Sequence, residues 1–322
     1  MIFRLLVTSA VLLVLLAGPA VSQTYPAKPI RVIVSYGPGG GSDVTGRILA
    51  LHLTERIGQQ VVVENRVGAG GTIGTEAVVR AAPDGYTVLL GSPSEIAINR
   101  VLYTRLSYDP MKDLAPVSLF ASTPLVFVVH PSLPVKSMKD VAALGKARPG
   151  QLNYGSAGTG SITHLAPAIF VSLTGISVVH VPYKGLGPAL ADLVGGQIHM
   201  ICFSVPAVLP LVGAGRIKAL AVTTAERAKS LPDVPTVAES GVKDYAVTQW
   251  YGLFAPAATS HEIIQRLHAE IAQTLRAPET LANIAKQGAD PGNMTHEQFV
   301  AFVNSEVAKW AKAAKESGAK LD

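Results

Sequence analysis

Residues 30–43 read IRVIVSYGPGGGSD, an apolar run that leads into a loop of four glycines and one proline. An amphipathic stretch, residues 44–58, follows, so the loop lies where a strand is expected to become a helix. Glycine costs backbone entropy on folding, so such a loop needs a reason. Either the backbone turns too sharply for a side chain, or a ligand approaches the backbone closely.

The same order of elements recurs along the chain. Short β-branched runs precede glycine-rich loops and helical patterns, and they cover residues 30–36, 60–66, 86–91, 152–158 and 178–184. Strands that alternate with helices predict parallel sheets covered by helices, with ligands bound at the carboxyl ends of the strands. We therefore expect an α/β fold with two α/β domains, mainly parallel sheets and a ligand cleft between the domains.

Two segments are candidates for the crossings between these domains, residues 118–134 and residues 245–257. The first domain would then be discontinuous. We expect it to comprise residues 23–121 and 249–322, with residues 122–248 forming the second domain.

Helix boundaries can also be predicted locally. In the helix after the first loop, Val44, Ile48 and Leu51 share one face, and Ser42 or Asp43 can cap its exposed amides. Ser137 and Asp140 have the spacing of a capping box, so a helix is expected to start there. From residue 261 onward the pattern is largely helical.

The N-terminus has the features of a secretory signal peptide. Arg4 precedes an apolar run and small residues before position 23. That run is shorter than the roughly 20 residues of a membrane span, so we expect residues 1–22 to be a cleaved leader and the protein to reach the periplasm. Cys202, the single cysteine, cannot form an internal disulfide and is expected to pack as a small buried side chain.

Charge excludes one class of partner. The formal net charge is +5, but positive and negative residues are interspersed, without a basic run or an aromatic ladder. We therefore expect no nucleic-acid partner. A modest positive field would suit a small anionic ligand.

The glycine loops are suited to binding an anion through the backbone. The first amides of a helix have no intrahelical partner and carry the positive end of the helix dipole. Glycine lets a carboxylate reach them without an intervening side chain. Residues 37–44 offer one such site and residues 155–164 a second, so the two loops could clamp a carboxylate. The alternative, that these glycines only make tight strand-to-helix turns, stays open for each loop.

Several enzymatic patterns are missing. Neither loop has the lysine of a P-loop, and the glycines of residues 68–74 do not fall in the register of a dinucleotide fingerprint. Ser156, Ser161 and His164 lie close in sequence, but G-x-S-x-G does not occur. His130, His180 and His199 are expected in strands or at strand ends rather than at a metal. We expect no catalytic residue, no metal and no cofactor.

Five long stretches, in order, carry a family resemblance: YPAKPIRVIVSYGPGGGSDVTGRILA (25–50), VVVENRVGAGGTIGTEAVVRAAPDGYTVLLGS (61–92), LNYGSAGTGSITHLA (152–166), VPYKGLGPALADLVGGQI (181–198) and ALAVTTAERAKSLPDVPTVAESG (219–241). They resemble the Bug (TctC) family, the periplasmic substrate receptors of tripartite tricarboxylate transporters. The resemblance runs from about residue 25 to the C-terminus. It implies a Venus-flytrap receptor whose two α/β domains close over an organic acid.

The resemblance also implies the ligand-binding residues. Those of the first loop are Tyr36, Gly37, Pro38, Gly39, Gly40, Gly41, Ser42 and Asp43. Those of the second loop are Ser156, Ala157, Gly158, Thr159, Gly160, Ser161 and His164. Others expected near the cleft are Ser92, Ser94, Asn99, Lys184 and Trp250.

The chain departs from the family pattern in two places. Many relatives carry an aspartate pair where this chain has His199 and Phe203. If Phe203 lines the pocket, the ligand is expected to be less polar than citrate, with an aromatic acid favoured; otherwise Phe203 packs in its domain core. Glu95 is the other departure. We expect it to point to solvent; if it faces the cleft, it would disfavour a second carboxylate nearby.

The function expected from these residues is that of a solute receptor, not an enzyme. It would bind a small organic carboxylate between the two loops and deliver it to the membrane permease subunits of the transporter, acting as a monomer. The alternatives are a sensory receptor that presents the ligand to a signalling protein and, less favoured, an exported hydrolase that uses Ser161 and His164.

Overall fold

The computed structural model describes residues 25–183 and 185–317. The expected signal peptide, residues 1–22, and Lys184 lie outside the described residues. In chain order the elements are β1 (Ile30–Val34), α2 (Gly41–Ile57), β2 (Val61–Asn65), η1 (Ala69–Gly71), α3 (Thr72–Val79), β3 (Thr87–Gly91), η2 (Ser94–Ile98), α4 (Asn99–Leu102), α5 (Pro110–Asp113), β4 (Leu114–Val129), α6 (Met138–Ala147), β5 (Leu152–Ser156), α7 (Ile162–Thr174), β6 (Val178–Pro182), α8 (Leu186–Val194), β7 (Met200–Ser204), α9 (Val205–Gly213), β8 (Lys218–Val222), β9 (Thr248–Pro256), α10 (His261–Thr274), α11 (Pro278–Lys286), β10 (Asp290–Pro291) and α12 (His296–Ser317).

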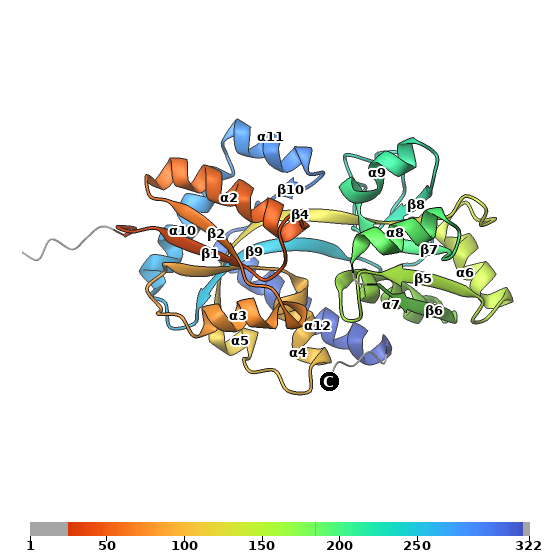
Figure 1. Ribbon diagram of the computed structural model, residues 1–322, viewed down its shortest axis with the longest axis horizontal. Coiled ribbons are helices and arrows are strands. Elements are labelled where there is room, and N and C mark those ends of the chain that lie inside the picture. The colour runs from red at the N-terminus through yellow and green to blue at the C-terminus, as the bar shows by residue number, and fades with distance from the viewer. Residues whose placement is uncertain (1–24, 184, 318–322) are drawn as a thin grey trace, which may run out of the picture.

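One sheet runs through the molecule in the order β2-β1-β3-β9-β4-β7-β5-β6, with β8 and β10 paired to β4. In the first lobe β1 is parallel to β2 and β3, and in the second lobe β5 is parallel to β6 and β7. The long strands β4 and β9 are antiparallel to their neighbours and connect the two lobes (Figure 1). The predicted α/β fold is confirmed. Of the segments predicted to cross between the domains, residues 245–257 contain β9, and residues 118–134 overlap β4, which begins four residues earlier.

Helices cover both faces of the sheet in each lobe (Figure 1). In the first lobe, alternate residues of β1 point to opposite faces: Val32 packs in the cluster with α2 and α10, and Ile33 in the cluster with α3 and α12. Helix α12 reaches further, because Trp310 belongs to the second-lobe core with Phe127 and Phe170. The C-terminal helix therefore contacts both lobes, and the residue boundaries of the domains stay a prediction.

The helix after the first loop differs from two local predictions. Its N-cap is Gly40, with no side-chain cap, because Asp43 folds back onto the loop instead. The buried face is formed around Leu49 and Leu53, whereas Leu51 is 51% exposed. The reason is Gly46, which has no side chain and packs closely against the sheet. A Cβ at this position would lie 3.1 Å from Val34.

Other local predictions hold. The Ser137 hydroxyl accepts a hydrogen bond from the Asp140 amide, and α6 begins at Met138 as the capping box predicts. Cys202 is fully buried and unpaired, as expected. His180 lies in β6, while His130 and His199 flank strand ends.

Candidate functional site

The two predicted binding loops follow β1 in the first lobe and β5 in the second, on the sides of the lobes that face each other (Figure 1). In the first loop, residues 38–41 are exposed. Gly40 has an extended backbone (φ −77°, ψ 166°), and no side chain caps the first turn of α2. The amino end of a 17-residue helix is therefore presented between the lobes with its backbone uncovered.

Asp43 braces this loop from within. One carboxylate oxygen accepts from the Gly39 amide at 2.9 Å, and the other accepts from the Asn65 side chain at 2.9 Å. Arg47 also donates to this carboxylate, and these hydrogen bonds, that of Arg47 foremost, lower the pKa of Asp43 to about 2. The Asp43 carboxylate is thus occupied by protein groups and shapes the loop.

Tyr251, the neighbour of the expected cleft residue Trp250, adjoins the same helix end. A Cβ placed on Gly41 would lie 2.4 Å from the Tyr251 hydroxyl oxygen, so this hydroxyl sits at the first turn of α2. Trp250 points to the other face of β9, where it is fully buried and donates to Glu306 at 2.8 Å. Adjacent strand residues face opposite ways, so a shift of one position separates these two roles.

The loops after β2 and β3 pack against the first loop on the side of the protein interior. Tyr36 donates to the Gly70 carbonyl at 3.2 Å, and the Asn99 side chain donates to the same carbonyl at 2.8 Å. A Cβ on Gly74 would lie 2.7 Å from the Ser35 hydroxyl oxygen. The glycines of residues 68–74 thus serve close packing between loops.

The loop after β3 contains the main correction to the expected site. Glu95, expected to point to solvent, is 0% exposed, because the loop turns it inward beneath Tyr36 and Gly71. Ser92 donates to it through both its hydroxyl and its amide, so Ser92 is occupied by Glu95. Ser94 is also nearly buried at 9%. Burial raises the pKa of Glu95 to about 7.

The second loop is held by its own polar groups. The Ser156 hydroxyl accepts from the Gly158 amide, Thr163 accepts from the Ala157 amide, and His164 Nδ1 accepts from the Gly160 amide at 3.2 Å. Thr159 is exposed at the tip of this loop. Three amides that the glycine pattern suggested for a ligand therefore already have acceptors in this conformation.

Two histidine rings lie under the second loop. His164 and His180 stack with ring centres 3.8 Å apart, and His180 Nε2 lies 2.7 Å from the Ser156 hydroxyl oxygen. Burial lowers the pKa of each ring to about 4, so both are neutral at neutral pH. Ser161 caps α7 and donates to the Gly158 carbonyl, and its hydroxyl is not paired with the His164 ring. This arrangement stabilises a loop and does not activate a nucleophile.

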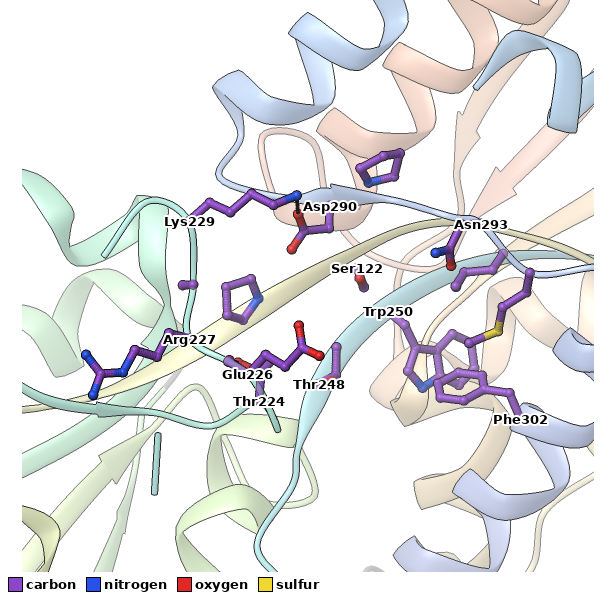
Figure 2. Close-up of a pocket in the computed structure, with 15 residues that line it drawn as sticks. Ser122, Thr224, Glu226, Arg227, Lys229, Thr248, Trp250, Asp290, Asn293 and Phe302 are labelled. Carbon is purple, nitrogen blue, oxygen red and sulfur yellow. Dashed lines mark hydrogen bonds and ion pairs between the residues drawn. The ribbon is translucent and has the colours of Figure 1, made fainter. Parts of the chain in front are cut away.

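A pocket of about 450 Å³ lies between the lobes at a different place, beside the crossing strands (Figure 2). Trp250 lines it, together with Ser122 and Thr248 of the crossing strands, but residues 36–43 and 156–164 do not. Lys229 of the second lobe and Asp290 of the first form an ion pair at its rim, 2.9 Å long.

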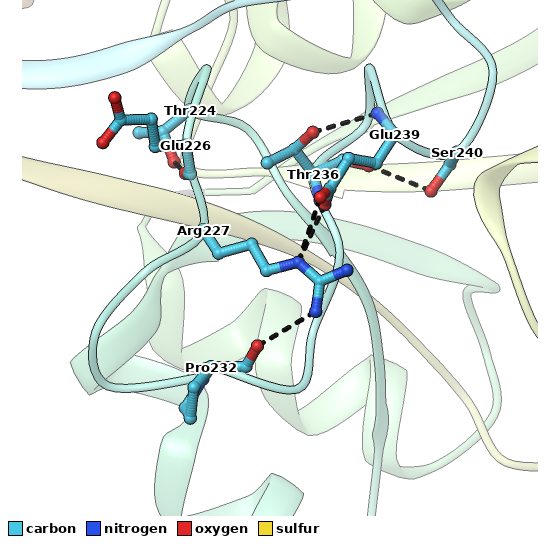
Figure 3. A network of polar contacts seen from close by, with 7 residues as sticks. All are labelled: Thr224, Glu226, Arg227, Pro232, Thr236, Glu239 and Ser240. Carbon is cyan, nitrogen blue, oxygen red and sulfur yellow. Dashed lines mark hydrogen bonds and ion pairs between the residues drawn. The ribbon is translucent and has the colours of Figure 1, made fainter.

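The segment that carries Lys229 is fixed by a polar network (Figure 3). Arg227 donates to the Glu239 carboxylate and to the Pro232 carbonyl, and Glu239 accepts from the Thr236 amide. This network lies within the stretch 219–241, one of those that carry the family resemblance. Of these four residues Arg227 lines the pocket, so the network fixes one wall of the pocket and not a glycine loop.

Phe203 lies inside the second lobe. It is 4% exposed and packs with Val126, Val205 and Val208 on the α8–α9 side of the sheet. The observed geometry is therefore that of the second alternative, in which Phe203 packs in its domain core. A role of Phe203 in ligand selection stays a prediction. Lys184 cannot be placed, because it lies outside the described residues.

Comparisons with known proteins identify the family. The sequence profile of the tripartite tricarboxylate transporter family receptor, TctC, matches residues 45–319. Protein BugT of Bordetella pertussis is 40% identical over 307 residues, which cover 95% of this chain and 94% of that protein. The chain belongs to the TctC receptor family.

Solved structures of other TctC-type receptors agree in fold. Rpa4515 of R. palustris, solved with adipate, is 37% identical with a TM-score of 0.82, over 92% of this chain and 100% of that one. MatC of Rhodopseudomonas palustris, solved with bound malate, is 29% identical with a TM-score of 0.78, over 90% and 99%. The structure of the periplasmic binding protein BugD has a TM-score of 0.78 at 32% identity.

This TctC-family chain is therefore a solute-binding receptor of the periplasmic type and not an enzyme. Within residues 25–183 and 185–317, no helix is long and apolar enough to cross a membrane. The same described residues hold no group of three or more histidine, cysteine or acidic side chains that could bind a metal.

Sequence reasoning missed three features beside the two predicted loops: the Tyr251 hydroxyl, the stacked His180 ring and the enclosure of Glu95. Strand alternation at residues 248–256 was the one available signal, and it places Trp250 and Tyr251 on opposite faces without saying which one meets the loop.

Proposed function

We propose that this receptor binds a small organic carboxylate between the loop at residues 36–43 and the loop at residues 156–164, and delivers it to the permease of a tripartite tricarboxylate transporter. The relatives solved with adipate and with malate support a carboxylate ligand. The proposal includes export with removal of residues 1–22, action as a monomer, and closure of the two lobes over the ligand.

The observation that carries the proposal is the backbone at Gly40. Its φ of −77° is open to any residue, and a Cβ there would meet only the Gly37 carbonyl oxygen, at an ordinary 3.5 Å. The fold therefore does not require glycine at this exposed position. A ligand that must approach the first amides of α2 does require it, because a side chain would lie over them.

The two lobes would contribute differently. In the first lobe, uncovered amides and the adjoining Tyr251 hydroxyl would receive the carboxylate. In the second lobe, the loop amides at residues 157, 158 and 160 are internally bonded, so the contribution would come from the exposed tip at Thr159 and from polar side chains.

The test is calorimetry of adipate, malate and benzoate with the mature protein and with Gly40→Val. Losing a charge-assisted hydrogen bond costs about 1.5–3 kcal/mol, so affinity should fall roughly 10- to 100-fold. Gly213→Val is the control, because Gly213 is a non-loop glycine whose Cβ would meet nothing within 4 Å. Binding of none of these acids, or equal affinity in folded Gly40→Val, would reject the proposed site.

Delivery is tested separately from binding. Uptake of a labelled acid that binds should fail in cells that lack this chain, and should return with the wild type but not with Gly40→Val. A receptor that binds the acid without affecting its uptake would have the sensory role instead.

A further inference from the structure

Glu95 is a carboxyl group enclosed where three loops of the first lobe meet. A Cβ on Gly71 would lie 2.9 Å from Glu95 Cγ, 3.2 Å from Ser35 Cβ and 3.3 Å from the Tyr36 hydroxyl oxygen. Ser92 binds only one carboxyl oxygen, Oε2. The other oxygen, Oε1, and the Ser35 hydroxyl are both buried, and neither makes a hydrogen bond of ordinary geometry among the described residues. Ser35 is nevertheless close enough to Glu95 to lower the pKa of its carboxyl group slightly, against the larger effect of burial.

The groups that face Glu95 are hydroxyls rather than cations. They come from the loop after β1, from the segment before α5 and from β9: Tyr36, Tyr108 and Tyr251. Burial is the largest cause that raises the pKa of each of these three tyrosines, and the nearby charge of Glu95 raises it further. An ionised carboxylate here would have neither solvent nor a counter-ion, which strongly disfavours it.

Charged groups on the neighbouring elements are engaged elsewhere. On α12, which packs against η2, Glu306 accepts from Trp250 and Trp310. Beside α5, Asp109 pairs with Arg100 and Lys112. None of these pairs supplies a positive charge to Glu95.

Glu95 is also connected to the proposed ligand position. Tyr36 belongs to the first binding loop, and the Tyr251 hydroxyl adjoins Gly41 at the amino end of α2. A ligand carboxylate held there would stand on the other side of these two tyrosines from Glu95. Like charges across so little low-dielectric space repel, and the repulsion is relieved when one of them binds a proton.

We propose that Glu95 takes up a proton when the receptor binds its carboxylate, so that ligand and proton bind together. The inference rests on the proposed function, because it needs an anion at the first loop. Glu95 acts as a positioning residue: in its neutral form it can hold Ser92 and still donate from the oxygen that now lacks a partner.

The size of the effect follows from the environment. Burial raises the pKa of Glu95 to about 7, so about half of the ligand-free molecules carry this proton at pH 7. Binding that completes the protonation takes up at most about half a proton per ligand at that pH. By reciprocity, affinity should weaken as the pH rises above 7, by up to tenfold per pH unit.

The experiment is calorimetry of adipate, malate and benzoate at pH 7 in phosphate and in Tris, whose ionisation enthalpies differ. The wild type should show proton uptake, and its affinity should fall between pH 6.5 and pH 8.5. Glu95→Gln, which mimics the neutral form, should bind with no uptake and with an affinity that does not vary over this range. Glu262→Gln, at an exposed carboxylate of α10, should behave as the wild type does.

Each failure has a separate meaning. If the wild type binds none of these acids, the proposed function fails and the coupling fails with it. If it binds an acid with no proton uptake, or if Glu95→Gln keeps the uptake, the coupling alone is wrong. Carbon-detected NMR titration of the ligand-free protein, assigned by difference from Glu95→Gln, is an independent check, and a Glu95 pKa below about 5.5 would overturn the inference.

Discussion

Replacing Glu95 by glutamine should make the stability of the protein less dependent on pH. The ordinary pKa of 4.5 rises to about 7 in the folded state, because burial penalises the charged form. Between these values the unfolded chain has lost the proton that the folded protein retains. Stability contributed by the neutral carboxyl is therefore complete below about pH 4.5, falls as the pH rises, and is lost above about pH 7.

The magnitude follows from the shift. One pKa unit corresponds to 1.36 kcal/mol, so a shift of about 2.5 units corresponds to roughly 3 kcal/mol. Between pH 4.5 and pH 8 the wild type should lose about this much free energy of unfolding, and Glu95→Gln should not. The difference in stability between the variant and the wild type should therefore grow by about this amount in favour of the variant. At pH 4.5 alone it should be equal or slightly less stable, because its hydrogen bond with Ser92 changes.

The assay is equilibrium unfolding in urea at several pH values, with the two-state approximation checked by two spectroscopic probes. The exposed Glu262→Gln serves as the control and should show no comparable change. A wild-type-to-Gln difference that stays constant from pH 4.5 to pH 8 would show that Glu95 is not an enclosed, proton-retaining carboxyl, and the reasoning from its burial would be refuted.

Four further outcomes are expected. Tyr251→Phe should weaken carboxylate binding roughly 10-fold or more with little change in melting temperature. The control Tyr245→Phe, which loses a hydrogen bond to the Ala166 carbonyl, should lower stability and leave affinity unchanged. Wild-type affinity in Tyr251→Phe would show that the Tyr251 hydroxyl does not contact the ligand. Saturating ligand should reduce the radius of gyration in small-angle scattering, and an unchanged curve would contradict closure of the lobes. Gly74→Ala should cost about 1–3 kcal/mol in urea unfolding, because its Cβ would lie 2.8 Å from the Arg66 carbonyl oxygen. Gly58→Asn should cost less, because its Cβ would meet nothing within 4 Å and asparagine tolerates the left-handed backbone at this position (φ +67°) better than other side chains do. Phe203→Asp should unfold the second lobe, because it buries an unpaired carboxylate. Phe203→Leu should keep the wild-type preference between benzoate and adipate. A folded Phe203→Asp protein with an altered preference would indicate that Phe203 lines the ligand site.

Short-range patterns predicted the elements of this fold well. Each β-branched run that precedes a glycine loop is a strand, and the Ser137 capping box starts a helix. These features are encoded within a few residues, where turn chemistry and side-chain spacing act directly.

Orientation was harder to predict, because it depends on pairings between distant segments. The buried face of α2 is decided by contact between Gly46 and residues of β1 and β3. Glu95 looks like a solvent-exposed loop residue until the loops from Ser35 and Gly71 close over it. Likewise, the choice between Trp250 and Tyr251 depends on which face of β9 meets α2, and no local pattern contains that information.

The structure also separates glycines that the sequence makes look alike. At Gly74 a Cβ would collide with Ser35 and the Arg66 carbonyl, and at Gly155 it would lie 2.6 Å from Ile198, so packing inside the protein excludes a side chain at both. Gly158 needs glycine for a backbone reason, because its φ is +132°. Gly40 has neither constraint, and it lies exposed at the amino end of α2. A glycine-rich loop is therefore weak support for a ligand site by itself, and the informative position is the glycine that the fold could replace.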